Sequence, residues 1–263
     1  MSLIITHNAG FFSCCSVKLD AIVNYINRHR KLPEKIDSSK QFKLYKPNPA
    51  VDITYDFFEI PNSSEYIFTN SIKYNYTYEY RKYSDLNFEN IVPIVKKYFE
   101  PSQQIKTLAD KFINKYNICY ENCIAIYYRG TDKRKLEKGK DTQKSFESYH
   151  NKLNELLTIV NNDNVQILIQ TDSAQFLNYI TTQNKNKQFI ILEELVPSNT
   201  CKGPHRERTK QQNYCDITNL LSIVSIISKC KYIICSTGNV SMWITLYRGN
   251  CENVYQNSHC NWV

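Results

Sequence analysis

Hydrophobic and polar residues alternate along the second half of the chain in a pattern that predicts strands separated by helices. Short apolar runs, typical of strands, lie at 122–128, 165–170, 188–192, 231–235 and near 252–255. Longer stretches, with apolar residues three and four positions apart, predict helices at 145–160, 173–181, 213–229 and 239–248. Strict alternation of strand and helix is typical of a parallel sheet, so this half predicts a Rossmann-like domain.

The first half carries the same pattern less clearly. Residues 3–6 predict a short strand, 16–30 predict a helix, and 34–37 predict the next strand. The stretch 38–83 is rich in tyrosine and interrupted by prolines, and its pattern assigns it to no element. The opening strand, loop and helix predict a smaller companion to the second half.

A clear amphipathic helix is predicted at 102–116, where the apolar residues recur at a helical spacing. We place the domain boundary just before this helix or within it. The chain is therefore predicted to be an α/β protein with a smaller domain at 1–115 and a Rossmann-like domain at 116–263, separated by a cleft.

The strand predicted at 122–128 stops abruptly at Arg129. Its last five residues are apolar or aromatic without period-two alternation, as expected for a strand covered on both faces. Ligands of open α/β sheets bind beyond the carboxyl ends of the strands, where Thr131, Asp132 and Lys133 follow the arginine. The guanidinium fork suits a phosphate. A plainer alternative is that Arg129 and Asp132 pair with each other at a strand end.

Two further predicted strands end in polar residues. Thr171 and Asp172 follow 165–170, and the segment 236–241 follows 231–235 at the start of a predicted helix, where backbone N–H groups attract anions. The plainer interpretation is helix capping, by Asp172, by the hydroxyl-rich segment and by Asp216 near the start of its own helix. Capping and ligand binding are compatible.

These strand ends resemble, in order, three motifs of the α1,6- and nodulation-type fucosyltransferases. The segment YYRGTDK at 127–133, with Glu137 beyond it, is similar to the first motif. The segments ILIQTDSAQF and YIICSTGNVS are similar to the second and third. Gly10 and the next three residues resemble the acceptor-side loop of related enzymes. The chain departs from the pattern at Tyr127, Gly130 and Gly238, where the family usually has histidine, arginine and serine.

The resemblance implies a GT-B-like fold of two Rossmann-like domains, the first reduced, and an inverting, metal-independent glycosyltransferase. Such an enzyme would move fucose from GDP-fucose to a hydroxyl of a glycan acceptor. Arg129 would stabilise the leaving diphosphate, Glu137 would act as general base, and Lys133 would relay the proton. The implied nucleotide-binding residues are Tyr127, Arg129, Asp132, Thr171, Asp172, Asp216, Ser236, Thr237, Gly238, Asn239 and Ser241, of which Asp216 would read the guanine base.

Three alternatives remain open at this point. The departures from the motifs leave room for another donor sugar, and a degenerate enzyme would bind a nucleotide sugar without transferring it. The net charge of +8 allows a nucleic-acid binder, although the excess is not confined to one tail and signals this function weakly.

Several common catalytic and metal-binding motifs are absent from the sequence. The chain has no phosphate loop, nucleophile elbow, zinc-protease motif or Gly-x-Gly-x-x-Gly, and no Asp-x-Asp clamp for a metal and nucleotide. We therefore expect no metal and no cofactor beyond the donor substrate. In the loop 197–212, His205 is expected to be solvated, and Arg206 and Arg208 are expected to be surface charges.

The N-terminus and the cysteines indicate the compartment in which the protein is expected. The N-terminus lacks a basic region before its short apolar run, and no stretch reaches the length of a membrane span, so we expect a cytoplasmic protein. The 10 cysteines show no zinc spacing. We expect buried free thiols at Cys119, Cys123, Cys230 and Cys235 rather than a disulfide framework.

Overall fold

A six-stranded sheet forms the centre of the second half of the chain. The structure, a computed structural model, describes residues 2–61, 70–130, 142–197, 208–258 and 261–263. The strand order is β5-β4-β3-β6-β7-β8, parallel except for the antiparallel last strand. The strands are β3 (Cys123–Tyr128), β4 (Gln166–Thr171), β5 (Phe189–Ile191), β6 (Tyr232–Ser236), β7 (Val254–Ser258) and β8 (Asn261–Trp262). The predicted α/β class is confirmed.

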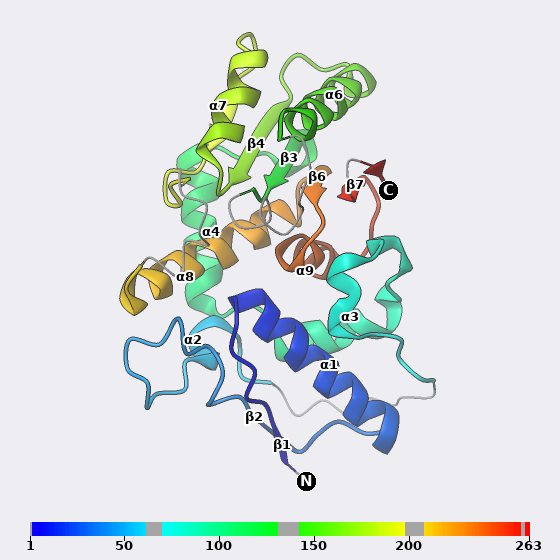
Figure 1. The fold of residues 1–263 in the computed structure, drawn as a ribbon, viewed down its shortest axis with the longest axis vertical. Helices are drawn as coiled ribbons and strands as arrows, with labels where there is room; N and C mark the ends of the chain where they lie inside the picture. The colour runs from blue at the N-terminus through cyan, green and yellow to red at the C-terminus, as the bar shows by residue number, and fades with distance from the viewer. Residues whose placement is uncertain (1, 62–69, 131–141, 198–207, 259–260) are drawn as a thin grey trace.

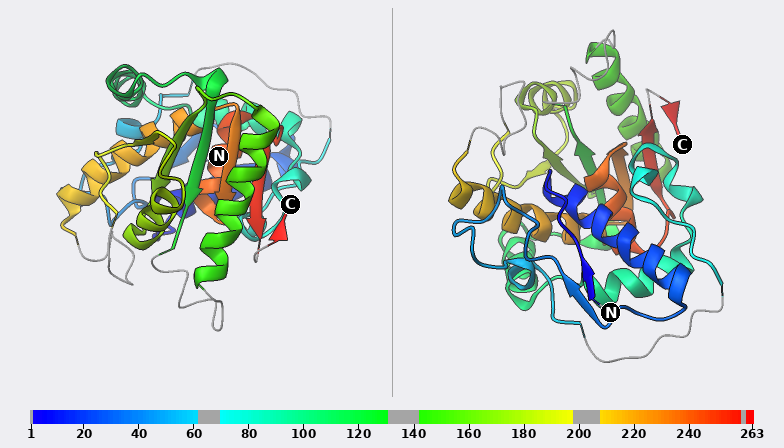
Figure 2. Two further views of the ribbon diagram at one scale, coloured as in Figure 1. Left: turned by 90° about the horizontal axis from the view of Figure 1, so that it is seen from above. Right: turned by 60° about the horizontal axis from the view of Figure 1, so that its bottom comes forward.

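Helices cover both faces of this sheet (Figures 1 and 2). One face packs against α6 (Thr142–Val160) and α7 (Ala174–Gln183), and the other against α4 (Gln103–Tyr116), α8 (Lys210–Ile227) and α9 (Asn239–Arg248). Successive residues of β3 enter the two hydrophobic clusters alternately, so Ala125 lies in one cluster and Ile124 in the other. Every residue of β3 is buried, which confirms the prediction of a strand covered on both faces.

The first half forms a smaller unit beyond the carboxyl ends of the strands. Its parallel pair β1 (Ser2–Ile4) and β2 (Lys35–Asp37) is connected by the long helix α1 (Phe11–His29), as the predicted strand-loop-helix pattern requires. The rest of this half consists of short elements, α2 (Thr54–Phe57), η1 (Tyr76–Tyr80) and η2 (Tyr83–Asp85), followed by α3 (Phe88–Tyr98); η3 (Tyr120–Asn122) then precedes β3.

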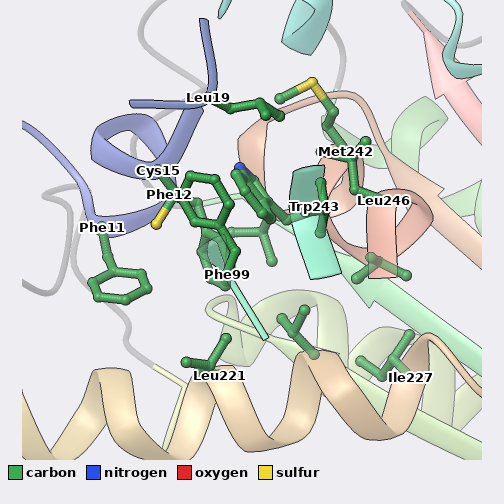
Figure 3. Packing of buried hydrophobic residues seen from close by; sticks show 14 of the residues in the cluster. Phe11, Phe12, Cys15, Leu19, Phe99, Leu221, Ile227, Met242, Trp243 and Leu246 are labelled. Atoms are coloured by element: carbon green, nitrogen blue, oxygen red, sulfur yellow. The ribbon is translucent and has the colours of Figure 1, made fainter. Parts of the chain in front are cut away.

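One continuous core joins the two halves, and Trp243 of α9 lies near its middle (Figure 3). The indole contacts Phe12 of α1, with ring centroids 6.2 Å apart, and Phe99, at 4.8 Å. Its N–H donates to Ser16 Oγ at 2.9 Å, so the buried polar atom is paired. Leu221 of α8 closes the cluster from below in Figure 3.

Several boundaries differ from the predictions for local reasons. Helix α1 begins at Phe11 rather than at residue 16, because the two phenylalanines of its first turn are buried core residues. Helix α8 begins at Lys210 rather than 213, because Thr209 and Gln212 form a capping box. Cys119 is exposed, so the prediction that it is buried was wrong.

Helix α3 was not predicted. It contains Pro93, a residue that normally ends a helical pattern, within its first two turns. The Asn87 side chain accepts a hydrogen bond from Asn90 N and caps the helix. Ile94 and Val95 are buried, so tertiary packing compensates for the proline.

The helices in the described part of the chain include none that is both long and apolar enough to cross a bilayer.

A buried lysine connects α1 to the segment after β2. Lys18 is 4% exposed and donates to Ser38 Oγ at 3.2 Å. Ser38 contacts Thr54 Oγ1 at 3.2 Å, and Thr54 donates to Asp52 Oδ1 at 2.7 Å. Burial lowers the pKa of Lys18 to about 8, and the nearby Cys15 and Asp52 oppose this shift. The ammonium is therefore buried at a cost in stability.

This cost predicts a pH dependence of stability. Between pH 8 and 10.5 the unfolded chain holds the Lys18 proton more tightly than the folded chain, so the free energy of unfolding contributed by this group rises with pH. In chemical denaturation, the free energy of unfolding of wild type should rise relative to that of Lys18→Met across this window, by up to about 1.4 kcal/mol per pH unit. A pH-independent difference between the two proteins would contradict the buried charge.

Candidate active site

The sheet reverses its strand order between β3 and β6. From β3 the chain winds through β4 to β5 on one side, and afterwards through β6 to β7 on the other. The connections on either side of this point diverge, which opens a crevice at the carboxyl ends of the strands. Arg129 directly follows β3, and Thr237 directly follows β6. Two of the predicted strand ends therefore meet at the switch point.

A cavity of about 370 Å³ lies at this edge, between the sheet and the first half of the chain. Its walls include Gly10 and Ser13 at the start of α1, and Tyr45 and Tyr80 from the stretch that received no assignment from the sequence. The predicted cleft between the two halves thus exists. The predicted site residues that line it are Tyr127, Arg129, Thr171, Asp172, Asp216 and Asn239.

The loop after β3 is tied to both neighbouring strands. Arg129 N donates to Ser236 Oγ at 3.3 Å, and Gly130 N donates to Asp172 Oδ1 at 2.8 Å. Asp172 therefore fixes this loop, and the prediction that it caps α7 was wrong. Ser173 caps that helix instead, by accepting from Phe176 N.

Gly130, one of the departures from the fucosyltransferase pattern, has a steric reason here. A Cβ atom at this position would lie 2.7 Å from Tyr128 Cε1 and 3.2 Å from Ser173 Cβ. The Tyr128 ring cannot easily move, because it stacks on Phe176 with centroids 4.0 Å apart. No side chain fits at residue 130 without displacing this buried pair.

Part of the cavity wall is apolar and comes from α8 and the segment after β5. Leu195, Val196, Ile217 and Leu220 line the cavity, and so does Asp216 of α8. Arg208 forms an ion pair with Asp216 and also lines the cavity, so the prediction that Arg208 is a surface charge was wrong. Capping of α8 by Asp216 was also wrong, since Thr209 caps this helix and Asp216 lies in its second turn.

The start of α9 is less open to an anion than the sequence suggested. Thr237 N donates to Asn257 O, and Gly238 N donates to Tyr83 Oη at 2.8 Å. The same hydroxyl donates to Gly238 O at 2.9 Å, and Gln256 Nε2 contacts Thr237 Oγ1. These two N–H groups hold the loop in place. An anion at this helix would therefore meet the N–H groups of the first helical turn, where Asn239 and Val240 line the cavity.

Asn239 is held from both sides. Its amide oxygen accepts from Ser16 Oγ of α1 at 2.6 Å, and its Nδ2 donates to Glu79 Oε2 at 2.6 Å. The side chain thus connects the sheet to α1 and to η1. Ser241, another predicted site residue, is buried behind this first turn and does not line the cavity.

Several cavity residues were missed by sequence reasoning. Glu79, Tyr80 and Tyr45 come from the tyrosine-rich stretch, which gave no periodic signal. Tyr45 Oη accepts from Phe11 N at 2.8 Å, and burial raises the pKa of Tyr45, while the charge of Arg129 opposes the shift. The density of tyrosines in a stretch without secondary structure was the available signal.

Part of the predicted site lies outside the described residues. Asp132, Lys133 and Glu137 follow the β3 loop there, and His205 and Arg206 precede α8 there. Their predicted roles stay predictions. Among the residues that the structure describes, no three His, Cys, Asp or Glu side chains gather closely enough to hold a metal ion.

Comparisons with known proteins give distant likenesses only. No protein-family model and no curated protein matches the chain. POFUT1 in its apo form is similar with a TM-score of 0.44 at 11% identity, over 64% of this chain and 49% of that one. POFUT1 in complex with GDP-fucose matches with a TM-score of 0.39 at 12% identity, over 63% and 47%.

A mutant of Arabidopsis thaliana FUT1 in complex with GDP matches with a TM-score of 0.38 at 10% identity, over 63% of this chain and 35% of that one. The chain spans about half the length of the POFUT1 structures. All of these are likenesses of fold alone.

The packing at Gly130 predicts the effect of adding one methyl group there. Gly130→Ala should lower the free energy of unfolding by about 1–3 kcal/mol, because the new Cβ must displace Tyr128 or Ser173. Gly10→Ala is the matched control, since a Cβ there meets nothing within 4 Å, and it should change stability by less than about 0.5 kcal/mol. Equal denaturation midpoints for the two variants would refute this account.

Proposed function

We propose that this protein is an inverting glycosyltransferase that takes a sugar from a nucleoside diphosphate sugar, with GDP-fucose as the first candidate, and transfers it to a glycan hydroxyl. The observation that carries the proposal is the place of Arg129. It directly follows the buried central strand, lies at the switch point of the sheet, and lines a cavity shared by both halves of the chain.

The chemistry of transfer explains why an arginine belongs there. As the bond between the anomeric carbon and the diphosphate breaks, negative charge gathers on the phosphate oxygens. A cation held in a sheltered cavity stabilises that charge more strongly than one in water. Asn239 and Val240, at the start of α9, add the positive end of a helix on the other side of the switch point.

The apolar residues in the cavity wall support a nucleotide with a purine base. Leu195 and Ile217 are two of them, and Asp216 adds a carboxylate of the kind that accepts hydrogen bonds from the N–H groups of guanine. The resemblance to fucosyltransferases implies the same role for this residue. Arg208, the ion-pair partner of Asp216, holds the carboxylate in place.

Transfer also needs a base for the acceptor hydroxyl. The resemblance implies Glu137 for this role and Lys133 as the proton relay, and we keep both as proposals. A protein that only binds nucleotide sugars remains the alternative. A measurement of turnover distinguishes this binding protein from a transferase, whereas a measurement of affinity does not.

Removal of the Arg129 side chain tests the phosphate site. Arg129→Ala should weaken GDP binding by roughly 100-fold or more in calorimetry, since a bidentate, charge-assisted contact is lost. Arg129→Lys should recover only part of the affinity, because an ammonium lacks the fork. Arg28→Ala, an exposed arginine on α1, controls for loss of charge. GDP affinity equal to wild type in Arg129→Ala would remove this residue from the site.

Chelation tests the metal-independent mechanism. Release of GDP from GDP-fucose, with an acceptor or with water, should continue at the same rate in excess EDTA, because protein cations stabilise the leaving group. Loss of activity in EDTA that manganese restores would overturn this mechanism.

A further inference from the structure

Two adjacent residues of η1, in the first half of the chain, line the cavity. Glu79 and Tyr80 both line it, together with Arg129 and Ser13. The Tyr80 side chain is 64% exposed, although it lies at the wall of the cavity. Burial, the charge of Glu79 and a hydrogen bond to it raise the pKa of Tyr80, and Arg129 opposes this shift, which places all three groups within electrostatic reach of one another.

The rest of η1 is held rigidly. Tyr78 is buried and stacks on Tyr74, with centroids 5.8 Å apart and planes 5° apart. The Arg81 guanidinium lies over the Tyr78 ring, 4.9 Å from its centroid. Asn75 caps the helix by accepting from Thr77 N. The next short helix is anchored through the Tyr83 contacts described above. A rigid support of this kind presents Glu79 and Tyr80 to the cavity in one orientation.

Glu79 is also held by the start of α9. Its Oε2 accepts from Asn239 Nδ2 at 2.6 Å, and Asn239 begins α9 beside the proposed phosphate site. The carboxylate therefore belongs to the part of the cavity wall that the first half of the chain supplies, and it lies close to the proposed donor site. An acceptor bound at Glu79 would be within reach of a group transferred from a donor at Arg129.

We propose that Glu79 and Tyr80 form the acceptor subsite and that the acceptor bound there is a sugar ring. A pyranose offers an apolar face of C–H groups and an equatorial rim of hydroxyls. An exposed tyrosine ring packs against such a face, and an adjacent carboxylate accepts hydrogen bonds from the hydroxyls. A peptide serine or threonine would present a single hydroxyl and would leave the exposed aromatic face unused. This inference rests on the glycosyltransferase function proposed above.

The experiment separates donor and acceptor binding. Saturation-transfer NMR with p-nitrophenyl glycosides of galactose, glucose and N-acetylglucosamine, each in the presence of GDP, measures acceptor binding without turnover. Release of GDP from GDP-fucose with the same glycosides gives the acceptor KM, and a threonine-containing peptide serves as the competing acceptor class. Calorimetry with GDP reports the donor side of each variant.

Tyr80→Ala should raise the acceptor KM about tenfold or more and weaken the NMR signal, whereas Tyr80→Phe, which keeps the ring, should stay within about threefold. Glu79→Gln should raise the acceptor KM about tenfold, the effect of losing a hydrogen bond to a charged group. GDP affinity should stay within about twofold throughout. Tyr76→Ala is the matched control, because Tyr76 is a half-exposed tyrosine of the same short helix that does not line the cavity.

An unchanged acceptor KM in Tyr80→Ala, or an equal effect of Tyr76→Ala, would overturn the subsite. Transfer to the peptide in preference to every glycoside would overturn the sugar as acceptor. If wild type fails to bind GDP at all, the proposed function falls and this inference with it. Intact GDP binding with unaffected variants would remove the subsite alone.

Discussion

The packing of α1 against α9 is the contact on which the rest of the structure depends. Trp243 fills the space between the two helices, and its indole N–H is paired with Ser16. Ser16 also donates to Asn239, so one hydroxyl links the tryptophan to the first residue of α9. Loss of a buried aromatic side chain of this size typically costs about 3–5 kcal/mol. Because this contact fixes the first half of the chain over the strand ends, it also forms the cavity.

The cavity combines two kinds of wall with different requirements. The sheet side needs residues that stay in place while charge develops, and it uses buried strands and backbone hydrogen bonds around Arg129 and Gly130. The opposite side consists of short helices and loops, whose tyrosines pack beneath the surface and leave Glu79 and Tyr80 facing the cavity. Rigid scaffolds commonly present variable binding residues in this way. The division fits the donor side and the acceptor side that we propose.

Charge in the cavity is nearly balanced among the described residues. Arg129 and Arg208 face Glu79, Asp172 and Asp216, and each carboxylate has a donor to it: Asn239, Gly130 and Arg208 respectively. The three carboxylates are therefore each held by a donor from a different part of the chain: the start of α9, the loop after β3 and the segment just before α8.

The sequence by itself determined the class of fold and the sheet side of the site. The near-continuous apolar run before Arg129 is a local signal, because a strand buried on both faces cannot tolerate polar residues, and the residue after such a strand must lie at the sheet edge. The positions of the strands could be predicted from such apolar runs. Because Thr171, Asp172 and Asn239 come just after predicted strands, their placement in one cavity could be predicted too.

Only the tertiary structure decided the rest. Three features of the site join residues from separate parts of the chain. They are the ion pair of Arg208 with Asp216, the hydrogen bond from Gly238 N to Tyr83, and the presence of Glu79 in the cavity. Helix α3, with its internal proline, forms because its apolar face is buried in the core that joins the two halves. Such contacts depend on how elements pack, and periodicity along one element carries no information about the partner that it meets.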